Sequence, residues 1–171
     1  MAPKDLGAAG TEIVDINIAE QISAFLIRFE FTNVTVSVNT ATIQECISKV
    51  EIVDGSEVLY SLNANEIQAM HYYATGKFPY SHIGLTVGDI NEFTLPIYFG
   101  RYLYDPIFAL RPERYRNLQC KITWNEDAAN ASVVVNECGL WAYVDDNPPG
   151  GGAKGFFRSV QQKSYAMAGA A

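Results

Sequence analysis

Residues 22–38 read ISAFLIRFEFTNVTVSV and carry the clearest structural signal in the chain. Every second residue from Phe25 to Phe31 is apolar, whereas Arg28 and Glu30 stand between them. Because side chains alternate between the two faces of a strand, this period of two predicts a β-strand with one strongly apolar face. Aromatic and β-branched residues, which favour strands, dominate the stretch. We expect the strand to bulge or bend at Asn33, where a polar residue interrupts the pattern.

The same period recurs through most of the chain. The Asp54-Gly55 pair between two such runs predicts a tight hairpin. Pro96 lies within another run and favours an edge strand or a bulge, because proline has no backbone N–H to donate. The runs that we interpret as strands are Ile13 with 16–18, 25–38, 47–53, 58–62, 93–99, 118–124, 132–136, 140–144 and 156–165.

One segment has helical spacing instead. Asn63 and Glu66 are three residues apart, as in a helix-capping pair. Gly76 stands where a residue in the left-handed conformation would end the helix. We therefore predict a helix of about twelve residues that begins at Asn63 or Asn65.

The order of these elements favours one antiparallel sandwich. Strands do not alternate with helices, which disfavours a parallel sheet, and no repeat indicates a propeller or a solenoid. The connections 76–92 and 100–117 are long, and the second holds a predicted helical turn after Pro112. Long cross-connections are typical of jelly rolls. We therefore predict an all-β fold: an antiparallel eight-stranded jelly-roll sandwich with one short helix in a connection.

On this interpretation the chain has three parts. Residues 1–10 (MAPKDLGAAG) are expected to form a flexible N-terminal arm, because small residues predominate and no packing pattern is present. Residues 11–165 form the jelly-roll domain. Residues 166–171 are expected to be a C-terminal tail or a linker, because they are small and form no capping strand.

Composition excludes several classes of protein. Of the 171 residues, 49% are hydrophobic, which is enough for a core and too many for a disordered chain. Twelve Lys and Arg against nineteen Asp and Glu give a formal net charge of −7, so no basic excess is available for a general nucleic-acid binder. No apolar run approaches the roughly eighteen residues that span a bilayer. We expect one soluble, acidic domain.

No combination of residues indicates catalysis. His71 falls on the predicted helix and His82 in a connection, so the two histidines cannot form the three-histidine metal site of a cupin. Cys46, Cys120 and Cys138 lack zinc-site spacing, and the first two lie in apolar stretches typical of buried thiols. No nucleophile elbow or phosphate-binding loop occurs. We predict no catalytic residue, no cofactor and no metal site.

The aromatic residues exceed what one small core needs: the chain has ten Tyr, nine Phe and two Trp. Several of them gather with arginines in the irregular segment 100–117, and Tyr and Arg are enriched at protein–protein contacts. The same residue types stack on sugars, and they also pack at the rim of a sandwich. Our candidate subunit-interface residues are Tyr102, Tyr104, Arg111, Arg114 and Tyr115.

Two segments resemble a known family. Residues 22–38 and 93–124 (FTLPIYFGRYLYDPIFALRPERYRNLQCKITW) resemble the first jelly roll of the double-jelly-roll major capsid proteins of tailless icosahedral viruses with an internal membrane. Arg111 departs from the family's Ala-Leu-Pro pattern, because it stands between Leu110 and Pro112. The residues that carry the likeness most clearly are Asp105, Ala109-Leu110, Pro112, Tyr115, Asn117-Leu118 and the strand Lys121–Trp124.

The resemblance implies a structural, non-enzymatic role. Members of that family carry two jelly rolls per chain, form trimers and tile an icosahedral shell, so this chain would be the amino-terminal half of a longer product or a single-jelly-roll relative. Its partners would be copies of itself, other capsid proteins and an underlying membrane, with no nucleic acid and no small-molecule substrate. It would reside in the virion after assembly in the host cytoplasm or nucleus.

Two rival functions remain open. A carbohydrate-binding jelly roll would stack sugars on exposed aromatic residues. It predicts that Trp124 or Trp141 is exposed, whereas the capsid interpretation expects both to be buried. An enzyme with the cupin fold would hold a metal ion in stoichiometric amount.

Overall fold

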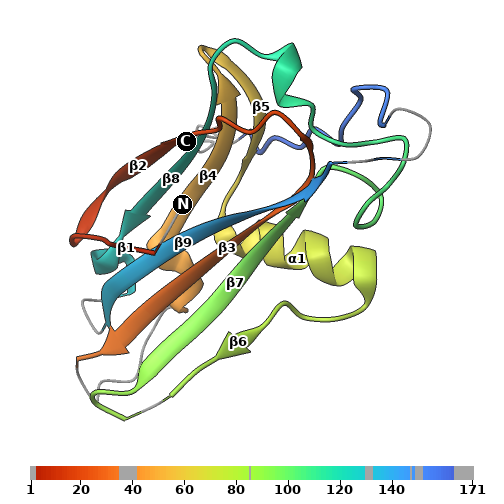
Figure 1. The fold of residues 1–171 in the computed structure, drawn as a ribbon. Helices are drawn as coiled ribbons and strands as arrows, with labels where there is room; N and C mark the ends of the chain where they lie inside the picture. The colour runs from red at the N-terminus through yellow and green to blue at the C-terminus, as the bar shows by residue number, and fades with distance from the viewer. Residues whose placement is uncertain are drawn as a thin grey trace, which may run out of the picture.

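The computed structural model describes residues 3–34, 42–84, 86–129, 133–146, 148 and 152–163. They form two antiparallel sheets (Figure 1). The five-stranded sheet has the order β1 (Lys4–Asp5), β9 (Val133–Asp145), β3 (Gln21–Asn33), β7 (Ile90–Tyr98) and β6 (Ser81–His82). The four-stranded sheet has the order β2 (Ala9–Asp15), β8 (Leu118–Asn125), β4 (Ile47–Asp54) and β5 (Glu57–Leu62).

The path of the chain is that of a jelly roll. Only β4 to β5 and β6 to β7 are consecutive strands of one sheet, and every other connection between described strands crosses to the opposite sheet. The predicted jelly-roll class is therefore confirmed. The strand number differs from the predicted eight, because the described residues form nine strands. The two-residue strands β1 and β6 were not predicted, and β6 pairs with β7 at the margin of the larger sheet.

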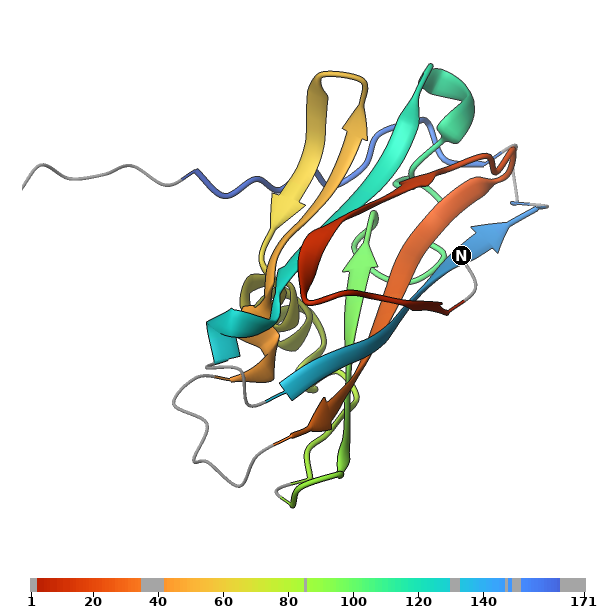
Figure 2. The ribbon, with the colours of Figure 1, turned by 90° about the vertical axis from the view of Figure 1, so that its left-hand side faces the viewer.

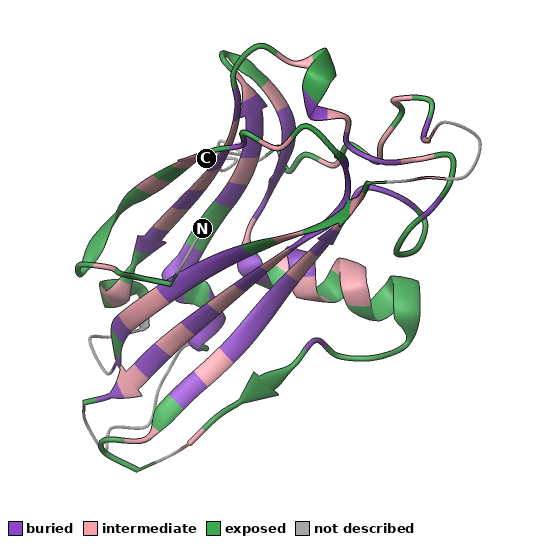
Figure 3. Cartoon of the chain, in the orientation of Figure 1, coloured by how far each residue is buried: buried purple, intermediate pink, exposed green. Residues whose placement is uncertain are grey.

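The central strand β3 forms for the reason that its sequence indicates. Its inward side chains, from Phe25 to Phe31, are buried, and its outward ones, such as Arg28, are partly exposed, which gives the alternation visible in Figure 3. Phe29 and Phe31 both stack on Phe93 of β7, with ring centroids 5.2 and 5.4 Å apart. Burial of each such ring contributes roughly 1.5–3 kcal/mol, so this stack anchors the core between the sheets.

The predicted bulge of β3 is not at Asn33, which is the last residue of the strand. The extra residue of β3 is Ser23, because Ile22 pairs with Val144 and Ala24 with Tyr143. The side-chain amide of Asn33 donates to the carbonyl oxygen of Gly84 at 2.7 Å, and its Oδ1 accepts from Asn91 at 2.8 Å. Asn33 therefore fastens the end of β3. The part of the predicted strand beyond residue 34 lies outside the described residues.

The two predicted runs 132–136 and 140–144 are one strand, which corrects the prediction. β9 continues through 13 residues and pairs with β3 along its length. Glu30 pairs with Glu137 and Phe31 with Val135, so Asn136 is the extra residue of a bulge. Because the bulge inserts one extra residue, the inward positions before and after it do not follow a single alternation. The sequence therefore looked like two strands.

Both ends of the domain also differ from expectation. Residues 1–10 were expected to be an unpacked arm, yet Lys4 and Asp5 pair with β9, and β2 begins at Ala9. Residues 156–165 were expected to form a strand. Among them the described residues 156–163 form isolated bridges only, Phe108 with Phe156 and Ser61 with Gln161. Figure 2 shows residues 152–163, which we call the C-terminal strap, crossing the molecule beside the β4–β5 hairpin.

The predicted turns and helix are confirmed. The hairpin at Asp54-Gly55 joins β4 and β5. The helix α1 (Ala64–Thr75) begins after Asn63, whose side chain accepts from the N–H of Glu66, and it ends at Gly76 with φ +71°. The turn after residue 111 is η2 (Pro112–Arg114). Two short helices, η1 (Ile43–Cys46) and η3 (Glu126–Ala129), were not predicted.

Pro96 lies where β7 has a described neighbouring strand on one side only, which suits a residue without a backbone N–H. It pairs with Leu26 of β3, and β6 covers β7 only at Glu92 and Phe93. Pro96 thus lies on a stretch of β7 that no described strand pairs on the other side. Instead α1 packs there, where the side-chain amide of Gln68 donates to the carbonyl oxygen of Thr94 at 3.4 Å. The helix closes the side of the sandwich between β7 and β5.

Candidate subunit interface

The loop between β7 and β8 is organised around the buried carboxylate of Asp105. Its Oδ2 accepts from Nε of Arg101 at 2.7 Å and from the Arg101 backbone N–H at 3.1 Å, and its Oδ1 accepts from a terminal guanidinium nitrogen at 3.1 Å. The backbone N–H groups of Ile107 and Phe108 donate to the same Oδ1 at 2.9 and 3.3 Å. The Arg101 guanidinium and these N–H groups hold the pKa of Asp105 well below its usual range. A single charged group therefore fixes the loop.

Gly100 leaves room for this arrangement. A Cβ at this position would lie 2.6 Å from the Cβ of Asp105 and 2.8 Å from the carbonyl oxygen of Phe108. Both atoms belong to the hydrogen-bonded part of the loop and cannot move independently of it. A larger residue at position 100 would therefore displace Asp105 from its donors.

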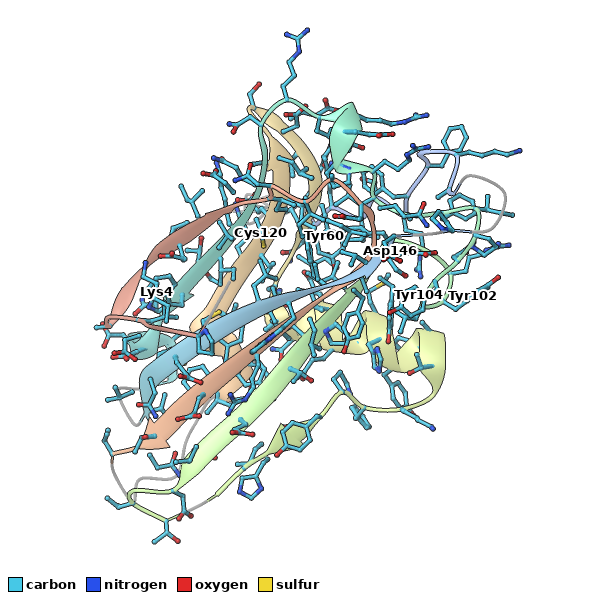
Figure 4. All side chains as sticks on the ribbon, in the orientation of Figure 1. Lys4, Tyr60, Tyr102, Tyr104, Cys120 and Asp146 are labelled. Carbon is cyan, nitrogen blue, oxygen red and sulfur yellow. The ribbon has the colours of Figure 1, made fainter. Side chains whose placement is uncertain are left out.

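The fixed loop presents two tyrosines to solvent. Tyr102 is 54% exposed and Tyr104 is 48% exposed, and Figure 4 shows them on the side of the molecule away from Lys4. Tyr104 has φ +60°, which is uncommon for a residue with a side chain, and its N–H donates to Oγ of Ser23 at 2.6 Å. These hydrogen bonds therefore hold the backbone in a strained conformation at Tyr104, whose side chain is exposed.

Arg111 and Arg114 make contacts within the chain. A terminal nitrogen of Arg111 donates to the carbonyl oxygen of Ala153 at 3.1 Å, and the other forms an ion pair with Glu113. Arg114 is exposed, but its guanidinium lies against Gly155, where a Cβ would come within 2.5 Å of three of its atoms. Both arginines therefore hold the C-terminal strap against the loop.

Tyr115 has a similar role. It is half-buried, and burial raises the pKa of its hydroxyl. Its ring meets the ring of Phe157 edge-on, with centroids 6.4 Å apart, and Phe157 in turn meets Phe99 at 6.2 Å. The strap continues to β5, where the N–H of Ser61 donates to the carbonyl oxygen of Val160 at 2.9 Å. Tyr115 is thus part of the packing under the strap.

Several exposed apolar side chains lie on this loop and on the strap beside it, and we call them the loop patch. The bond from the N–H of Ala109 to the carbonyl oxygen of Phe156, 3.0 Å long, brings the strap beside the loop. Phe156 is 63% exposed. Exposed apolar side chains that occur in a group mark interaction sites more often than isolated ones do. The members of the loop patch are Tyr102, Leu103, Tyr104, Ile107 and Phe156.

The residues with catalytic potential are dispersed or buried. All three cysteines are buried, as predicted for Cys46 and Cys120, and burial raises the pKa of Cys120 and of Cys138 to about 12. His71 stacks on Tyr98 with ring centroids 5.6 Å apart, and burial lowers its pKa. His82 lies on β6, away from the helix. Within the described residues no group of three or more His, Cys, Asp or Glu could hold a metal ion, and no helix could cross a bilayer.

One expectation about tryptophan was wrong. Trp124 is buried, and its Nε1–H donates to the carbonyl oxygen of Gly7 at 2.6 Å. Trp141, however, is 41% exposed on the outer face of β9, because Leu140 takes the inward position. The alternation of residues along β9 would have placed Trp141 on the outer face only if the bulge at Asn136 had been known.

No protein-family model matches the chain, and no curated protein matches it. Among solved structures, the chain is similar to the crystal structure of the STIV MCP, a major capsid protein of the double-jelly-roll family, with a TM-score of 0.61 and 12% sequence identity. The likeness establishes the fold. It covers 84% of this chain and 47% of the STIV protein, so this chain spans about half the length of that relative.

Proposed function

We propose that this chain is the first jelly roll of a viral major capsid protein, a structural protein that trimerises and tiles an icosahedral shell. The fold match to the STIV MCP carries the proposal, because it extends over most of this chain and over about half of that protein. A single jelly roll would account for about half the length of a chain that contains two. The protein would reside in the virion, assembled with copies of itself, with other capsid proteins and with an underlying membrane.

The loop patch supports this function. A shell subunit must bury broad lateral surfaces against its neighbours, and a rigid aromatic surface loses little entropy when it is covered. Asp105 fixes the loop in advance of contact, and Tyr102 and Tyr104 project from it. We propose these two tyrosines as contacts between copies, with Arg111, Arg114 and Tyr115 supporting them through the strap.

The test compares the complete gene product with the variant Tyr102→Ser/Tyr104→Ser by size-exclusion chromatography with light scattering. We expect the parent protein to be a trimer or larger, and the variant to shift toward the monomer. Ile13→Ser is the matched control, since Ile13 is 51% exposed on β2 in the other sheet. A parent protein that stays monomeric at high concentration would overturn the proposal.

The exposure of Trp141 favours carbohydrate binding as the second candidate. The indole borders a surface groove of about 430 Å³ lined by Leu26, Arg28, Thr94, Trp141, Ala142 and Tyr143. An aromatic face with polar groups beside it is suited to stacking a sugar ring. Titration with a panel of glycans would quench Trp141 fluorescence if this candidate is correct, and Trp141→Phe would abolish the response.

A further inference from the structure

A second exposed aromatic surface lies between the end of α1 and β6, and we call it the aromatic ridge. Tyr73 is 86% exposed and Phe78 is 77% exposed, although large apolar rings normally lie inside a domain. Figure 3 shows continuous exposure along most of this segment. The members of the ridge are Tyr72, Tyr73, Lys77, Phe78, Tyr80 and Ile83.

The ridge is held in shape before any partner arrives. The rings of Tyr72 and Phe78 stack with centroids 4.5 Å apart. The hydroxyl of Thr75 donates to the carbonyl oxygen of His71 at 2.8 Å and accepts from the N–H of Lys77 at 3.2 Å, which fixes the turn after the helix. Rigid aromatic side chains lose little conformational entropy on contact, so they act as anchors at interfaces.

The charge of the ridge is opposite to that of the rest of the chain. No Asp or Glu occurs from residue 67 to residue 88, although the chain has nineteen of them. The same stretch holds Lys77 and both histidines. A neighbouring carboxylate is that of Glu92 on β7, which pairs with His82 and is hydrogen-bonded by Tyr80. Because copies with a net charge of −7 repel each other, approach is less costly at a segment that carries no carboxylate of its own. The ridge therefore fits a surface that is both acidic and aromatic.

This chain carries such a surface on the outer face of its five-stranded sheet. The indole of Trp141 lies over Gly139, where a Cβ would come within 2.2 Å of its Cη2 atom. The flat indole and Tyr143 form one wall of the 430 Å³ groove, which Leu26 also lines. The groove is open enough to receive an aromatic side chain from another molecule.

Carboxylates lie beside this groove in one row across the sheet. Asp5 pairs with Glu137, Glu137 with Glu30, and Glu30 with Glu92, on β1, β9, β3 and β7. Arg28 is the cation among them, and it contacts Glu30, Glu92 and Glu137. Four carboxylates against one guanidinium leave an excess of negative charge. One residue separates the row from the groove lining on β3 and on β7, and three residues separate Glu137 from Trp141 on β9.

We propose that the aromatic ridge of one copy docks on the outer sheet face of a second copy, with Phe78 entering the Trp141 groove and Lys77 meeting the carboxylate row at Glu137. The inference rests on the proposed function, since it names the surfaces through which copies meet. The contact joins two different surfaces, so each copy can bind one neighbour through its ridge and another through its outer sheet face. Such a heterologous contact builds rings or extended arrays.

Charge exchange tests the contact on the complete gene product by sedimentation velocity. Lys77→Glu and Glu137→Lys each place like charges at the contact, and each is expected to weaken self-association by about tenfold. The double variant Lys77→Glu/Glu137→Lys restores opposite charges and is expected to recover most of the parent's association. Phe78→Ser is expected to weaken association in the same way through loss of the anchor. Lys49→Glu, an exposed lysine of the other sheet, is the matched control.

The outcomes separate this inference from the proposed function. If the parent protein assembles and the charge variants assemble equally well, the ridge contact is wrong and the capsid role stands. If the single variants fail and the double variant fails equally, Lys77 and Glu137 do not meet and the assigned contact is wrong. If the parent protein never assembles, both proposals are overturned. Circular dichroism of each variant confirms that a loss of association is not a loss of folding.

Discussion

Asp105 binds Arg101 through two side-chain hydrogen bonds of 2.7 and 3.1 Å, and its carboxylate is completely buried while the arginine remains half exposed. The pair lies at the base of the loop that presents Tyr102 and Tyr104. A buried carboxylate that satisfies side-chain and backbone donors together determines the shape of a loop that has no regular secondary structure.

Asp105→Asn should therefore destabilise the domain by roughly 1.5–3 kcal/mol, because one amide cannot replace all the acceptors of the carboxylate and leaves buried donors unsatisfied. Urea unfolding at neutral pH measures the change. Asp127→Asn, at an exposed position in η3, is the control and should change stability by less than about 0.5 kcal/mol. Equal stability of Asp105→Asn and the parent would contradict the role given to this carboxylate.

Two neighbouring phenylalanines of the strap should respond in opposite ways to truncation. Phe157 packs on Phe99 and Tyr115, whereas Phe156 points largely to solvent. Phe157→Ala should cost about 2–4 kcal/mol in the free energy of unfolding, and Phe156→Ala should cost less than about 0.5 kcal/mol. Thermal and urea unfolding provide the comparison. A larger loss for Phe156→Ala would show that the strap is not seated as described.

Protonation of Glu92 at low pH should lower the stability of the domain. Its hydrogen bond with Arg28 lowers the pKa of Glu92 below the ordinary value of 4.5. A depressed pKa contributes stability that is present above pH 4.5 and is lost as the pH falls toward the folded-state value. Glu92→Gln should therefore show a flatter decline of unfolding free energy as the pH falls below 4.5. Glu57→Gln, an exposed control, should follow the parent curve; identical slopes for all three proteins would refute the assignment.

The sequence was informative wherever one local rule acted alone. Alternation around Phe29 predicted a strand with a buried face, Asp54-Gly55 predicted a hairpin, and Asn63 with Gly76 predicted both ends of the helix. In each case the residues that decide the structure are neighbours along the chain. Long connections were enough to favour a jelly roll over a simple meander.

The sequence failed where distant segments decide the outcome. The bulge at Asn136 exists because β9 must match the register of β3, and it determines that Trp141 faces outward. The strap adopts its path because it bonds to the loop and to β5, which its own sequence does not encode. Of the five candidate interface residues, Tyr102, Tyr104 and Arg114 are exposed to solvent, while Arg111 and Tyr115 are partly buried against the strap.

The environments of the two tryptophans should be separable by fluorescence quenching. Trp124 is buried and hydrogen-bonded to Gly7, and Trp141 is exposed over Gly139. Trp141→Phe should leave blue-shifted emission that iodide barely quenches, and Trp124→Phe should leave red-shifted emission that iodide quenches readily. The reverse assignment would contradict the register of β9.

The most direct test of the central claim is the sedimentation velocity of the complete gene product across a hundredfold range of concentration. A self-assembling shell subunit should sediment as a trimer at the lowest concentrations and as larger species above them. A single monomeric boundary at every concentration would contradict the account, and it would do so most decisively if a glycan bound at Trp141 under the same conditions.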